Sequence, residues 1–155
     1  MSIKERLSAL GLTLPTAAAP VAAYVPAVKS RNLIFTAGQL PVVEGKLVKE
    51  GKVGSDVTAE DAKELAQICA LNALAAISLV ADLDQVERVV RVGGFVNCAP
   101  GFTAIPGVVN GASELLIKVF GDLNGKHTRV AVGVFELPLN SPVEIEIIFE
   151  LRQTT

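Results

Sequence analysis

The segment from Thr58 to Asp82 constrains the fold most, because it has the pattern of a helix whose apolar surface must be covered by other parts of the protein. Thr58 with Asp61 three residues later is typical of a helix N-cap and an acidic first turn, and the pattern continues to about Asp82. From Ile68 to Val80 the residues are apolar on nearly every side. We therefore expect this helix to lie on a sheet and also to touch another helix or another subunit.

The rest of the chain predicts strands around this helix. A second helix is expected from Pro106 to Phe120, ending at Gly121. Strand patterns cover residues 21–28, 32–39, 86–97, 128–137 and 143–151, and the glycines at 93 and 94 suggest a bulge or a close backbone approach. The last two strands are expected to form a hairpin closed by residues 137–142. The order ββαβαββ predicts an α+β two-layer sandwich, one mixed sheet with two helices on one face.

Length and composition limit the function. A chain of 155 residues and 16.2 kDa predicts one domain, which we place at residues 20–155 after an N-terminal extension at 1–19. Half of the residues are hydrophobic and 19% are charged, which argues against disorder. The net charge of −2 and the 5% aromatic content give neither the basic surface nor the stacking residues of a nucleic-acid binder, so no nucleic-acid partner is expected.

Membrane and metal partners are not expected either. The most apolar stretch, Leu65 to Ala81, is interrupted by polar residues and is shorter than the roughly 20 residues that span a bilayer. The first six residues do not predict a signal peptide, so a cytoplasmic location is expected. Cys69, Cys98 and the single histidine, His127, fit no metal spacing, so no metal site is predicted.

The last two predicted strands carry the candidate chemistry. Glu144 and the acids two and six residues after it share one strand face, which is either a solvated surface or part of a site. Arg129 lies in the preceding strand beside the small residues Ala131 and Gly133. Small neighbours leave space, so the guanidinium could bind a carboxylate in bidentate fashion, and the alternative is a surface arginine in an ion pair.

Several segments together resemble one family, the reactive intermediate deaminases, also called YjgF-like or L-PSP endoribonucleases. The resemblance covers about residues 20 to 151, and the segments that carry it are 23–28, 35–41, Asn110 with Glu114, 128–132 and 137–145. It implies a chorismate-mutase-like fold, a homotrimer and small-molecule clefts between subunits. It also implies hydrolysis of a small carboxylated enamine or imine to a 2-keto acid and ammonia, without a metal or an organic cofactor.

The resemblance also implies roles for individual residues. Arg129 matches the arginine that binds the substrate carboxylate, and Glu144 matches the acid that positions the attacking water. Tyr24 and Asn110 match a tyrosine and an asparagine of the cleft, and Gly38 would offer a backbone N–H.

Four positions depart from the family pattern. Ala37 and Ala131 occupy substrate-binding positions where active deaminases often have serine and cysteine, respectively. His127 replaces the usual proline or alanine, and Phe135 replaces a small or basic residue. The chain therefore resembles a divergent, longer branch of the family, whose substrate could differ.

Two further hypotheses follow. If residues 137–142 close a hairpin, Arg129 and Glu144 lie roughly 20 Å apart, so each cleft would take them from different subunits and a monomer would be inactive. A non-catalytic, trimeric carboxylate-binding protein is the main alternative to the enzyme.

Ribonuclease activity rests only on the other family name, and the acidic composition argues against it. A purely structural role has no positive feature in the sequence.

Overall fold

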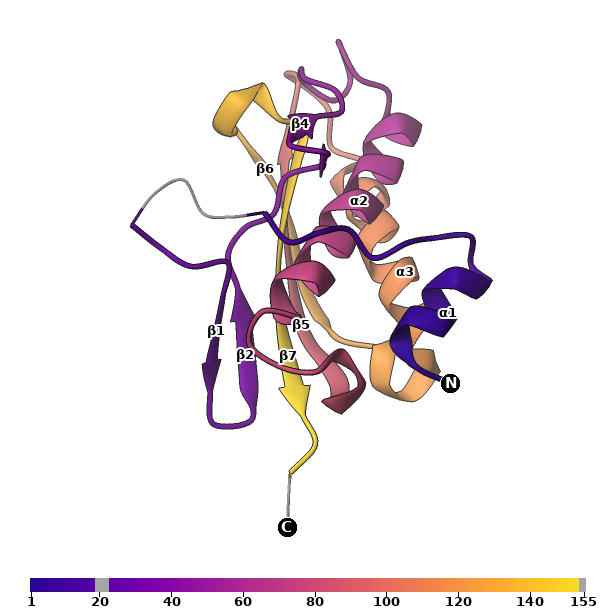
Figure 1. Cartoon of the computed structure of the whole chain (residues 1–155). Coiled ribbons are helices and arrows are strands. Elements are labelled where there is room, and N and C mark those ends of the chain that lie inside the picture. The colour runs from indigo at the N-terminus through magenta and orange to yellow at the C-terminus, as the bar shows by residue number, and fades with distance from the viewer. Residues whose placement is uncertain (19–22, 154–155) are drawn as a thin grey trace.

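A five-stranded mixed sheet with α2 and α3 packed on one face makes up most of the molecule (Figure 1). The computed structural model describes residues 1–18 and 23–153. The elements are α1 (Ile3–Ala9), β1 (Ala27–Ser30), β2 (Leu33–Thr36), β3 (Val42–Val43), β4 (Lys46–Leu47), α2 (Ala59–Ile77), β5 (Val86–Asn97), α3 (Ile105–Gly125), β6 (Thr128–Val134) and β7 (Val143–Leu151). Apart from the added α1 and the small β3–β4 hairpin, this is the predicted ββαβαββ order, and the predicted α+β sandwich is confirmed.

Helix α2 begins where predicted and ends earlier. The Thr58 side chain accepts a hydrogen bond of 3.1 Å from the Asp61 amide, which satisfies one of the free N–H groups of the first turn. The helix ends at Ile77, five residues before the predicted end at Asp82. It packs against both α3 and β7, as expected of a helix that is apolar on nearly every side.

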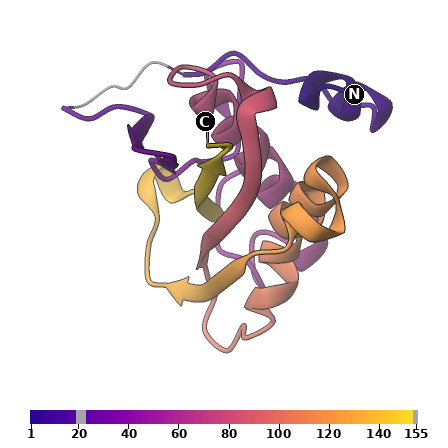
Figure 2. The ribbon, with the colours of Figure 1, turned by 90° about the horizontal axis from the view of Figure 1, so that it is seen from below.

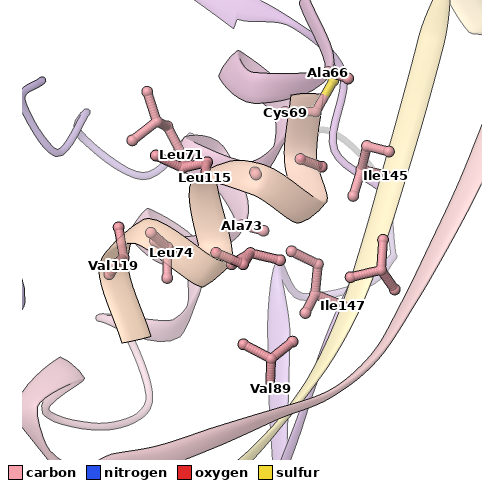
Figure 3. Packing of buried hydrophobic residues seen from close by; sticks show 14 of the residues in the cluster. Ala66, Cys69, Leu71, Ala73, Leu74, Val89, Leu115, Val119, Ile145 and Ile147 are labelled. Carbon is pink, nitrogen blue, oxygen red and sulfur yellow. The ribbon is translucent and has the colours of Figure 1, made fainter. Parts of the chain in front are cut away.

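The core lies between the two helices and the sheet. Figure 3 shows leucines of α2 and α3 facing Val89 of β5 and the isoleucines of β7. The predicted apolar face of β7 is confirmed, because Val143, Ile145, Ile147 and Phe149 are all buried. Within the described residues, no helix is both long and apolar enough to cross a bilayer.

The N-terminal helix belongs to the packed structure. Ser2 and Glu5 form a capping box at the start of α1, and Ile3 and Leu7 are buried in the core. Figure 1 shows α1 beside α3. The predicted boundary between residues 19 and 20 lies outside the described residues, as does the start of the first predicted strand at 21–22; β1 begins at Ala27.

The predicted hairpin of the last two strands is wrong. The sheet order is β1-β2-β7-β5-β6, so β6 pairs in parallel with β5 while β7 lies between β2 and β5 (Figure 2). Helix α3 makes a crossover between β5 and β6, and such a crossover returns the chain parallel to the first strand. The connection after β6 is tied to the end of β5, where the Asn97 amide donates to the Pro142 carbonyl at 2.9 Å.

The two glycines of β5 allow close approach but do not form a bulge. The register shifts of β5 lie between Val86 and Arg88 and between Val89 and Arg91, so the predicted bulge at Gly93 and Gly94 is wrong. A Cβ on Gly93 would collide with the Glu146 side chain on one face, and a Cβ on Gly94 would collide with the Val109 side chain of α3 on the other.

Candidate functional site

Arg129 is held by a group of polar side chains from α3 and the turn before β6. Its Nη1 donates to Asn110 Oδ1 at 2.7 Å and to Ser113 Oγ at 3.3 Å. Ser113 Oγ lies 2.9 Å from His127 Nε2, and His127 Nδ1 lies 2.6 Å from the Gly125 carbonyl oxygen. We call Arg129, Asn110, Ser113 and His127 the arginine cluster. The crossover of α3 onto the sheet places all four together.

Glu144 lies beside the chain segment that follows β2. Gln39 and Ile145 exchange two backbone hydrogen bonds, of 2.8 and 3.0 Å, which brings Gly38 next to Glu144. A Cβ on Gly38 would lie 2.8 Å from Glu144 Cδ, so only glycine leaves room for the carboxylate in this position. We call Glu144 and Gly38 the glutamate cluster. Burial, and to a lesser degree the neighbouring Glu146, raise the pKa of Glu144.

Of the remaining predicted residues near Gly38, Tyr24 borders a cavity and Ala37 does not. Tyr24 is 55% exposed and, with Pro26, Gly38 and Gln39, borders a cavity of about 1000 Å³. Ala37 is anchored by its amide, which donates to the Pro26 carbonyl at 2.8 Å. This cavity is also lined by Ile68, Leu71 and Asn72 of α2, and Glu144 does not border it, so Gly38 is the predicted residue that the structure brings next to Glu144.

The two clusters lie on opposite faces of the sheet. Arg129 is in register with Val92 and, through it, with Ile147, whose side chain points into the core under the helices. Glu144 follows the alternation of β7 onto the opposite, open face. Arg129 and Glu144 lie two strands apart in the sheet and are offset by three residues along the strands, so their backbones are about 14 Å apart. This distance replaces the roughly 20 Å expected from the predicted hairpin.

The small residues of β6 leave less space than the sequence suggested. Ala131 lies on the face of Arg129, in register with Gly94, and packs against the core. A Cβ on Gly133 would lie 3.0 Å from Cys98 Sγ and 3.1 Å from Ile105 Cδ1, so these side chains already fill the space beside Gly133. Gly133 therefore adds no space for an anion beside Arg129.

The comparisons with known proteins agree with this architecture. Residues 4–151 match the family model described as "YjgF/chorismate_mutase-like, putative endoribonuclease". The chain belongs to this YjgF-like family. The Protein TCP17 of Trypanosoma cruzi is 39% identical over 97% of this chain and 94% of its own length. A RutC family protein of Aquifex aeolicus is 32% identical over 86% of this chain and 93% of its own length.

Solved structures of other proteins show the same fold. A protein of unknown function from Agrobacterium tumefaciens is 42% identical with a TM-score of 0.86, and the match covers 96% of this chain and 91% of that one. The YjgF gene product of Escherichia coli is 27% identical with a TM-score of 0.65, over 91% of this chain and 98% of that one. The predicted family is thus confirmed, while the roles of the individual residues stay predictions.

Two members of the arginine cluster were missed as site residues. Ser113 was not singled out, and within the candidate site His127 was named only as a departure from the family pattern. Signals for both exist in the sequence, because Ser113 lies three residues after Asn110 on one helix face and His127 lies two residues before Arg129. Neither spacing points to the other element, so only the crossover reveals that they meet.

No metal or organic cofactor is proposed for this site. Among residues 1–18 and 23–153, the side chains that ligate metals do not gather in groups of three or more. Burial, with a smaller contribution from the Arg129 charge, lowers the pKa of His127, although its hydrogen bond to Gly125 opposes this shift. The arginine cluster therefore offers a cationic guanidinium next to a neutral imidazole, an arrangement suited to an anionic group.

Proposed function

We propose that this YjgF-like protein hydrolyses small carboxylated enamines or imines to a 2-keto acid and ammonia, in clefts between the subunits of a homotrimer. The observation that carries the proposal is the placement of Arg129 and Glu144 on opposite faces of one sheet. A small ligand cannot touch both groups of one chain, whereas two neighbouring chains can bring one of each to the same cleft.

The open face of the sheet supports an assembly. Val28, Phe35 and Val132 are 51%, 41% and 39% exposed, and the strand registers place them on the same face as Glu144. Apolar side chains gathered on one face favour contact with another protein surface. A second copy of this chain would cover them and bring its own edge strand β6 toward Glu144.

The chemistry requires positioning more than activation. Arg129 would hold the substrate carboxylate and place the imine carbon next to a water held by Glu144 and the Gly38 N–H. The water oxygen adds to the imine carbon while Glu144 takes its proton, and the proton then passes to the nitrogen. The remaining hydroxyl proton of this adduct then passes through Glu144 to the nitrogen, the carbon–oxygen double bond forms as the carbon–nitrogen bond breaks, and ammonia leaves the ketone. The raised pKa of Glu144 makes the carboxylate a better proton acceptor.

A second candidate is a non-catalytic protein that binds a small carboxylate. Ala37 and Ala131 favour it, because a methyl group stands at two positions where the resemblance leads us to expect polar side chains. In this case the arginine cluster would still bind a carboxylate, and a ligand would raise the thermal stability without being consumed.

The deciding experiment compares the native protein with Arg129→Ala on freshly generated 2-iminobutyrate. We expect ammonia and keto-acid release above the spontaneous rate in the native protein, and a loss of about 100-fold or more in the variant, since a bidentate charged contact disappears. Arg152→Ala, at an exposed position after β7, is the matched control. No acceleration by the native protein, together with stabilisation by 2-oxobutyrate, would instead establish the binding protein.

A further inference from the structure

The hydrogen bonds of the arginine cluster have a defined direction. The Gly125 carbonyl can only accept, so His127 Nδ1 carries the hydrogen of their 2.6 Å contact. A neutral imidazole then presents Nε2 as an acceptor, and the Ser113 hydroxyl donates to it across 2.9 Å. With its hydrogen so directed, Ser113 Oγ turns a lone pair to Arg129 Nη1.

These hydrogen bonds engage Nη1 of the guanidinium and leave the edge formed by Nε and Nη2 without a partner among the described residues. Nη1 has two hydrogens, and these are directed at Asn110 Oδ1 and Ser113 Oγ. Within the described part of the chain, no hydrogen bond engages Nε or Nη2 of Arg129. These two nitrogens carry parallel N–H groups, so they form the side-on edge that can hold a carboxylate through two bonds.

We propose that Ser113 and His127 are positioning residues that hold Arg129 with its Nε–Nη2 edge directed at the substrate carboxylate. Asn110 fixes the same nitrogen from the neighbouring turn of α3, so Nη1 is held from two directions. The inference rests on the proposed function only in assuming that Arg129 binds a carboxylate. It assigns a task to the histidine that replaces the proline or alanine usual in the family.

Burial makes the pair effective. Ser113 is only 8% exposed, and His127 is half-buried, so water competes poorly for the bonds between them. Without the imidazole, the Ser113 hydroxyl would be free to rotate and could turn its hydrogen toward the guanidinium. Arg129 would then lose an acceptor and sample other orientations, at a cost to binding of the carboxylate.

The test measures ligand binding and catalysis separately in the full chain. Binding of 2-oxobutyrate is followed by calorimetry, and KM and kcat are measured with 2-iminobutyrate. We expect Ser113→Ala and His127→Ala each to raise the Kd and the KM by about 3- to 10-fold, the effect of one hydrogen bond, with kcat nearly unchanged. The double variant should lose no more affinity for 2-oxobutyrate than the single variant with the larger loss, because both changes break the same chain of hydrogen bonds.

Two variants separate positioning from general effects. His127→Gln carries an amide oxygen that can accept from Ser113 and should recover most of the affinity. Lys126→Gln removes a charge from the exposed neighbouring residue and should leave the Kd unchanged. Because His127 is the only histidine, its nitrogen NMR shifts can be assigned directly, and they should report the hydrogen on Nδ1.

The outcomes separate this inference from the proposed function. Unchanged Kd and KM in Ser113→Ala and His127→Ala, with binding lost in Arg129→Ala, would overturn the positioning role and leave the deaminase proposal standing. A hydrogen found on Nε2 would also overturn it. A native protein whose binding of 2-oxobutyrate weakens in Ser113→Ala and His127→Ala but which hydrolyses no imine would contradict the deaminase and support the positioning role.

Discussion

The arginine cluster and the glutamate cluster belong to the same sheet but are built in different ways. The arginine cluster is completed by one βαβ crossover, in which α3, the turn after it and the start of β6 supply every side chain. Its central nitrogen has two acceptors in place. The glutamate cluster joins β7 to the segment after β2, and no described residue donates a hydrogen bond to the Glu144 carboxylate.

The two clusters therefore differ in how far one chain satisfies their polar groups. Arg129 is already held by two acceptors, whereas Glu144 is half-buried with a raised pKa, and no hydrogen bond or ion pair from residues 1–18 and 23–153 reaches its carboxylate. A buried carboxylate without donors is unfavourable, and a partner subunit or a bound water could supply them. The predictions below test whether the two halves do meet between subunits.

The largest effect is expected from mixing two inactive variants. Arg129→Ala and Glu144→Gln should each be inactive, but trimers co-assembled from equal amounts should recover about a quarter of the native rate, the share of clefts that receives both intact residues. The measurement is ammonia release after joint refolding. Mixtures as inactive as the separate variants would show that one chain supplies both groups.

A methyl group at Gly38 should damage the glutamate cluster alone. In Gly38→Ala the new Cβ would occupy the place of the Glu144 carboxylate, so we expect the carboxylate to swing away and kcat to fall by about 10-fold or more. Binding of 2-oxobutyrate through Arg129 should change little. Gly107→Ala is the matched control, because its Cβ would meet no atom within 4 Å. Equal losses in both variants would contradict the contact.

A smaller effect is expected on the pH dependence. If ionised Glu144 is the base, kcat falls as the pH drops through its raised pKa. Glu146→Gln removes the neighbouring negative charge that contributes to this shift, so the acidic limb should move to lower pH. The pH profile of kcat for both proteins is the measurement. An acidic limb that stays in place would mean that another group controls it.

The smallest effect concerns stability and the arginine cluster. The pKa of His127 is lowered in the folded protein, so the unfolded chain binds the extra proton more readily. Stability from this residue should therefore decrease as the pH falls below about 6.5, the value for an unperturbed histidine. Urea unfolding of the native protein and His127→Gln should show the difference only on the acidic side. Parallel pH curves would argue against a buried neutral imidazole.

Much of the fold could be predicted from local patterns. Strand β5 has the predicted bounds, Thr58 caps α2, and the apolar face of β7 lies in the core. The second helix was predicted to end at Gly121; α3 instead continues to Gly125, but Gly121 is non-helical within it, with a φ of 82° that suits glycine. These features depend on residues close in sequence, so the sequence carries their signal directly. Helix ends depend on weaker preferences, and α2 accordingly stops at Ile77.

The candidate site was predicted only in part for the same reason. Arg129 and Glu144 were singled out by the strand pattern, and Asn110 and Gly38 by the family resemblance, while the only signal for Ser113 is its spacing from Asn110. Its importance comes from contacts with His127 and Arg129, which are 14 and 16 residues away. A buried serine on a helix is ordinary until the element that packs against it is known.

The order of the five main strands and two long helices, the buried face of β7 and the family all followed from the sequence. The position of β7 between β2 and β5 and the parallel pairing of β6 with β5 depend on tertiary contacts. Strand alternation sets which face a residue occupies relative to its own neighbours, but the pairing partner depends on how distant segments bury their apolar surfaces together. That pairing places Arg129 and Glu144 on opposite faces of the sheet, and for this reason the proposed function takes them from two chains.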